Sequence, residues 1–200
     1  MAQPSASSVA SVRRAVRFVA VANFAYFFVE FAVATHIGSV ALFADSIDFL
    51  EDTAVNVVVL VGLGWTMLAR ARLGMMLAVV LLLPGIATLW TAWHAWQAQA
   101  VPAAASMSVT GTGALAVNMT CAFVLARVRE RRDSLTRAAF LSARNDAFAN
   151  IGIIVAGLIT AIHASHWPDL IVGIAIFFMN LDAAHDVLGA ARRELHAAES

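Results

Sequence analysis

The chain has 200 residues, of which 61% are hydrophobic and only 13% are charged, and its formal net charge is zero. A soluble domain averages roughly 45–50% apolar and about 25% charged residues. The composition therefore excludes an ordinary soluble protein and indicates that lipid is the solvent. The single cysteine, Cys121, also excludes a disulfide within the chain and a thiolate cluster.

Six segments of the chain each offer the roughly 20 mostly apolar residues that a helix needs to cross the hydrocarbon. In chain order they are Phe18–Thr35, Val40–Met67, Leu73–Trp96, Met107–Leu125, Ala138–Ile162 and Asp169–Leu188. We therefore predict an all-α membrane protein with six transmembrane helices. Residues 13–190 form the transmembrane domain in this prediction, residues 1–12 and 191–200 are short tails, and no C-terminal domain follows.

The arginines predict the orientation of these helices. They gather before the first predicted span, between the second and third, between the fourth and fifth, and after the sixth, whereas the other three loops contain no Lys or Arg. Because positive loops stay on the cytoplasmic side, we expect both termini in the cytoplasm and the protein in the inner (plasma) membrane. The regular alternation of loops with and without arginine supports six spans independently of hydropathy.

The second predicted span contains acidic residues that lipid does not tolerate. An acid at the bilayer centre costs about 2.5–3.5 kcal/mol, and this span holds Asp45, Asp48, Glu51 and Asp52 within eight positions. At 3.6 residues per turn, Asp45, Asp48 and Asp52 share one face of the helix, and Asn56 continues it one turn later. The pattern predicts a polar stripe that needs a partner, a proton or a cation.

The fifth predicted span carries a matching face. Ser142, Asp146 and Asn150 follow one another at four-residue intervals. At about 1.5 Å per residue, Asp146 comes to a depth between those of Asp48 and Asp52. We therefore predict that three carboxylates and a hydroxyl meet near mid-membrane, where oxygen ligands suit a small divalent cation.

Three further residues are secondary candidates for this site. Asp45 could bind the cation, pair with Arg144 or hold a proton, and Glu51 has the same alternatives. Asn145 could supply an amide oxygen, although it lies about 100° from Asp146 around the helix.

The same residues carry a resemblance to a known family. The stretch Ala22–Asp52 resembles the first two helices of the cation diffusion facilitator family, with Glu30, the Gly38-Ser39 turn and the Asp45-x-x-Asp48-x-x-x-Asp52 motif in register. The stretch that begins at Phe140 is similar to the family's fifth helix, with Asp146 at its Asp position. The resemblance implies efflux of a divalent metal by proton antiport, because clustered carboxylates can bind protons in place of the metal.

Two departures from the family pattern affect the expected substrate and assembly. Ser142 stands where the family usually has a metal-binding His, which lowers the expectation of zinc and raises that of manganese, iron(II) and cobalt, with cadmium also a candidate. We also expect no counterpart of the family's usual cytoplasmic C-terminal domain. A homodimer through the third and sixth helices remains an open alternative.

Three other functions are alternatives to the transport of a metal ion. The sequence has no G-x-S-x-G and no H-E-x-x-H, so we do not expect an enzyme. A non-transporting metal-binding or sensor subunit would fit the loss of the histidine. An organic-cation transporter would use Phe43 and Phe49, but the close grouping of the acids favours a bare ion. Metal and protons are thus the expected substrates and the bilayer the expected partner, with no bound cofactor and no nucleic acid.

Overall fold

The computed structural model describes residues 6–62, 85–128 and 134–199, which form helices and no strand. Within these ranges the side chains of residues 6–9, 59, 61–62, 128, 134–145, 183–184 and 186–199 are not described. The helices are α1 (Ala6–Ile37), α2 (Val40–Gly62), α4 (Ala104–Val128), α5 (Ser134–Ile162) and α6 (Trp167–Glu199), together with a helical segment at 85–98. The prediction of an all-α fold with six helices is confirmed.

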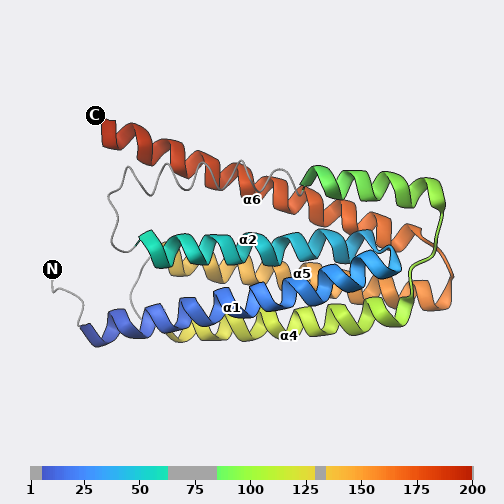
Figure 1. Ribbon diagram of the computed structural model, residues 1–200, viewed down its shortest axis with the longest axis horizontal. Helices are drawn as coiled ribbons and strands as arrows, with labels where there is room; N and C mark the ends of the chain where they lie inside the picture. Colours follow the sequence, from blue (N-terminus) through green and yellow to red (C-terminus); the bar gives the residue numbers. More distant parts are fainter. Residues whose placement is uncertain (1–5, 63–84, 129–133, 200) are drawn as a thin grey trace.

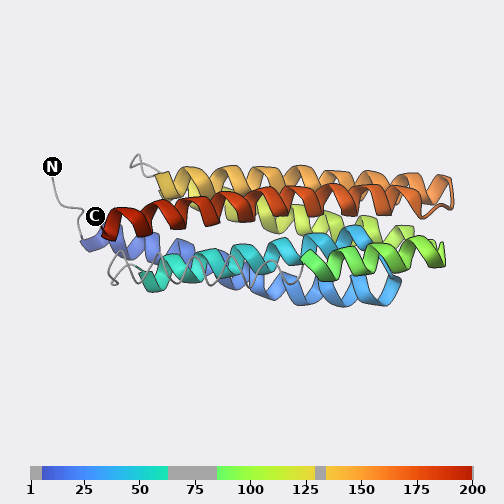
Figure 2. The same cartoon turned by 90° about the horizontal axis from the view of Figure 1, so that it is seen from above.

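The helices lie lengthwise in one elongated bundle (Figure 1). The start of α1 and the end of α6 lie at the same end of the bundle. The short links at 38–39, 99–103 and 163–166 all lie at the opposite end, which Figure 2 shows from a second direction. This arrangement agrees with the alternation that the arginines predict.

Small residues let α4 and α5 pack closely along the bundle. A Cβ atom at Gly157 would meet Ser108 Oγ and come within 3.1 Å of the Ala104 carbonyl oxygen, so only glycine fits there. Elsewhere α1 packs against α2 and α4, and α2 packs against α6. Direct contact between α2 and α5 is limited.

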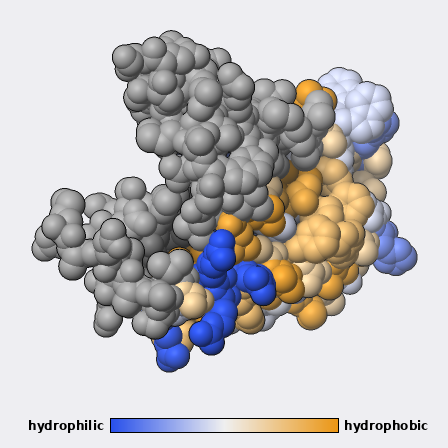
Figure 3. Space-filling model, turned by 60° about the vertical axis from the view of Figure 1, so that its left-hand side comes forward, coloured by the Kyte–Doolittle hydropathy of each residue, from blue (hydrophilic) through white to orange (hydrophobic). Residues whose placement is uncertain are grey.

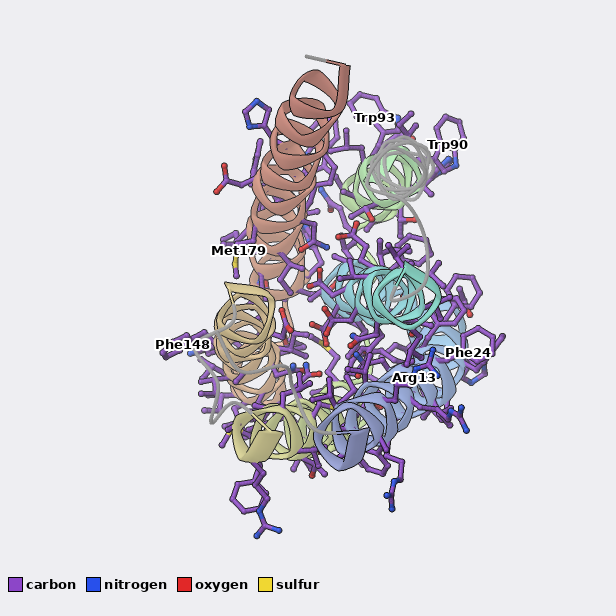
Figure 4. The ribbon with its side chains drawn as sticks, turned by 90° about the vertical axis from the view of Figure 1, so that its left-hand side faces the viewer. Arg13, Phe24, Trp90, Trp93, Phe148 and Met179 are labelled. Atoms are coloured by element: carbon purple, nitrogen blue, oxygen red, sulfur yellow. The ribbon has the colours of Figure 1, made fainter. Side chains whose placement is uncertain are left out.

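The outer face of the bundle is apolar. Figure 4 shows that Phe24, Trp90, Trp93, Phe148 and Met179 point away from the centre, and between 40% and 66% of each side chain is exposed. Figure 3 shows this apolar surface between hydrophilic groups at its two ends. Such a surface is suited to lipid contact.

Two of the described helices, Ala10–Ile37 of α1 and Ala104–Arg127 of α4, are long and apolar enough to cross a membrane by composition alone. The apolar part of α5, Asp146–Ile162, is shorter. Helix α2 is not one of them, because four acids interrupt its apolar sequence, and it lies beside α1 in the bundle.

Helix α2 begins at a cap that comes from α6. Gly38 takes a positive φ of 69° and turns the chain between α1 and α2. The Asp169 carboxylate then accepts hydrogen bonds from Ser39 Oγ at 2.6 Å, from the Val40 amide at 2.8 Å and from the Ala41 amide at 3.1 Å. A carboxylate satisfies the unpaired amides of a helix start and matches its dipole. The contact holds α6 against the start of α2.

Candidate cation site

Buried polar side chains gather in the centre of the bundle, where Figure 4 shows oxygen atoms between the helices. They come from α1, α2, α4 and α5: Asn23, Glu30, Asp45, Ser46, Asn56, Asn118, Asp146 and Asn150. Polar groups are expensive to bury in a membrane protein and usually mark the path of a substrate or ion. The centre of the bundle is therefore the candidate site.

Helix α2 presents its acids to this centre. Asp45 is completely buried, and Asp48 and Asp52 are half-buried. The Asp52 Oδ2 atom accepts a hydrogen bond from Asn23 Nδ2 of α1 at 3.1 Å. Asn56 donates its amide to the Asp52 backbone carbonyl at 2.7 Å, so this donor is satisfied within its own helix.

Helix α5 brings Asp146 to the same region. Asp146 is buried, and its Oδ2 atom has no hydrogen-bond partner in the part of the chain that the structure describes. The Asp146 carboxyl group interacts electrostatically with those of Asp48 and Asp52. The structure thus places the three predicted carboxylates around one interior region.

The three carboxylates do not form a closed metal centre as they stand. Among the described residues, no three side chains of the His, Cys, Asp or Glu type lie close enough together to hold a metal ion. Ser142 and Asn145 lie on α5, one turn and one residue before Asp146, but their side chains are outside the described set. Their roles as ligands stay predictions.

Asp45 faces a partner that the sequence did not assign to it. The Glu30 carboxyl group of α1 lies within hydrogen-bonding range of the Asp45 carboxyl group. None of the four oxygens has a donor among the described side chains and backbone amides. A hydrogen bond between two carboxyl groups requires a proton on one of them. Of the alternatives for Asp45, the geometry therefore favours a proton over direct ligation of the cation.

Two residues of α1 were missing from the predicted site. Asn23 and Glu30 are both fully buried, and they are seven residues apart, so they share a face of the helix. The i, i+7 spacing of two polar residues in an otherwise apolar helix was the available signal.

A helical bundle with an apolar exterior and carboxylates from three helices in its centre defines a class of protein, the membrane transporters of cations. The family described as the cation efflux transmembrane domain matches residues 16–195, and the chain belongs to this family. It is therefore a membrane transporter of cations and not an enzyme. No curated protein matches the chain.

Proposed function

We propose that this protein exports a divalent transition-metal ion from the cytoplasm in exchange for protons, using Asp48, Asp52 and Asp146 as ligands together with Ser142. The observation that carries the proposal is the buried Asp146 carboxylate, whose Oδ2 atom has no partner among the described residues and which faces the acids of α2. Such a group needs a cation or a proton to be stable in the membrane.

The chemistry of the ligands narrows the choice of ion. An all-oxygen set of carboxylates and a hydroxyl suits harder divalent ions, whereas imidazole suits zinc. We therefore rank manganese, iron(II) and cobalt above zinc and cadmium. Asn145 is a secondary oxygen donor in this proposal.

Proton exchange follows from the same carboxylates. When the site faces the outside, protons neutralise the acids and release the metal, and when it faces the cytoplasm the metal replaces the protons. In either state the buried charge is compensated, so the site can pass between the two orientations. The proton gradient then supplies the driving force.

The proposed setting is the inner (plasma) membrane, with six spans and both ends of the chain in the cytoplasm. The arginine pattern supports this orientation. A homodimer through the third and sixth helices stays a prediction, and cysteine crosslinking between copies would test it.

The deciding experiment is metal uptake into proteoliposomes with an acidic interior. Zinc, manganese, iron(II), cobalt and cadmium would be compared for the natural chain, for Asp146→Asn and for Asp182→Asn. Asp182 is an exposed acid on α6 and serves as the control. We expect flux that needs both the pH gradient and Asp146, and that Asp182→Asn leaves unchanged.

The other outcomes separate the alternatives. Metal uptake that does not depend on the pH gradient would support metal transport but contradict proton antiport. Tight metal binding without any flux would reject transport and favour the metal-binding or sensor subunit.

A further inference from the structure

Asn23 connects three helices at the centre of the bundle. It lies on α1 and none of its surface is exposed. Its Nδ2 atom donates to Asp52 Oδ2 of α2 at 3.1 Å, and its Oδ1 atom accepts from the Cys121 thiol of α4 at 3.5 Å. Both ends of one amide are therefore engaged, each by a different helix.

The chemistry of the two neighbours fixes the orientation of this amide. An ionised carboxylate only accepts hydrogen bonds, so the amide must turn its nitrogen toward Asp52. The thiol is a weak donor and suits the oxygen on the other side. The side chain of Asn23 is thus held in one orientation, with a donor aimed at an acid of the candidate site.

We propose that Asn23 is a positioning residue that orients the Asp52 carboxylate for the transported cation, an inference that rests on the proposed function. The terminal torsion of an aspartate is broad, so the direction of its carboxylate depends on the donors that hold it. Groups that hydrogen-bond a metal ligand typically change metal affinity 10–100-fold when they are removed. The Asn23 amide occupies this position relative to Asp52.

A purely structural role for Asn23 can be separated from positioning, because the same helix offers a matched control. Tyr26 lies one turn further along α1, and its hydroxyl donates to the Thr110 carbonyl of α4 at 2.6 Å. This bond also joins α1 to α4, but the Tyr26 hydroxyl donates to the backbone and not to an acid of α2. Removing it tests the junction of α1 and α4 without removing a donor to Asp52.

The test is a cobalt(II) titration of the purified full chain, followed by calorimetry and by the visible absorption of bound cobalt, with uptake measured in proteoliposomes. The variants are Asn23→Leu, Tyr26→Phe and Cys121→Ala. Asn23→Leu is expected to raise the Kd and the KM for cobalt roughly tenfold while the maximal rate stays within about twofold of the natural chain. Tyr26→Phe and Cys121→Ala should change the Kd by no more than about threefold, because the bond from the amide to Asp52 remains.

Each result has a defined meaning. If Asn23→Leu binds cobalt as tightly as the natural chain, or if Tyr26→Phe weakens binding equally, the positioning role is overturned while the proposed function stands. If the natural chain neither binds nor transports cobalt or any other metal offered, the proposed function fails and this inference fails with it. Should Asn23→Leu not fold, the smaller Asn23→Ala decides the question. It removes the donor without adding a charge beside Asp52, and a Kd raised less than about tenfold would count against the role.

Discussion

The Ser39 hydroxyl donates a hydrogen bond to Asp169 across 2.6 Å, which joins residues 130 positions apart in the chain. The Ser39 Oγ atom also accepts from the Leu42 amide at 3.1 Å, as an ordinary helix cap does. The start of α2 is therefore capped twice, once by its own chain and once by α6. The helix that carries the acidic stripe is held in place at this end.

Replacing Asp169 by Asn should destabilise the protein. The change removes the charge and turns one oxygen into a donor that faces the amides at the start of α2. We expect the free energy of unfolding to fall by about 1–3 kcal/mol, measured by thermal unfolding in detergent. The exposed Asp182→Asn on the same helix is the control, and an equal effect of both changes would contradict the capping role.

Replacing Glu30 by Gln should stabilise the protein. The Glu30 and Asp45 carboxyl groups are buried without other donors among the described residues, and the new amide supplies one to Asp45. The carboxyl pair makes its hydrogen bond only while one of the two groups holds a proton, whereas the amide donates without one, so a rise in the unfolding temperature at neutral pH is expected. The reciprocal Asp45→Asn should act in the same direction. A loss of stability in both variants would contradict this expectation.

Replacing Gly157 by Ala should destabilise the packing of α4 on α5. The added methyl group would meet Ser108 Oγ and the backbone of Ala104. Overpacking of this kind costs typically about 1–3 kcal/mol. Gly152→Ala on the same helix is the matched control, because its methyl group would only reach Val172 at 3.5 Å. Equal unfolding temperatures of the two variants would refute the close approach at Gly157.

Replacing Ser142 by His should shift the metal preference toward zinc. The change restores the residue that the cation diffusion facilitator family usually has at this position, and imidazole suits zinc better than a hydroxyl does. We expect zinc to compete with manganese at least about tenfold better than in the natural chain. Competition is measured in proteoliposome uptake, with Thr112→His at an exposed position of α4 as the control. An unchanged preference would remove position 142 from the ligand set.

Much of the fold was predictable because its signals are local. Hydropathy gave the helices, and the spacing of Asp45, Asp48 and Asp52 gave the polar face of α2. The partners of these acids were not predictable in the same way. They depend on how α1 is rotated about its axis, and an apolar helix in lipid has no polar outer face to fix that rotation. The spacing of Asn23 and Glu30 shows that they share a face, but only the packed helices show that this face meets Asp52 and Asp45.

The limited contact between α2 and α5 has a mechanical consequence. Asp48 and Asp52 are anchored to α1 and α6 through their own helix, whereas Asp146 is anchored to α4 through the tight glycine packing of α5. The predicted ligands thus lie on two helices that are joined mainly through α1 with α4 and through α5 with α6. A shift at those two interfaces changes the spacing of the carboxylates while it breaks few contacts between α2 and α5. The affinity for a cation can therefore depend on how all the helices of the bundle are packed.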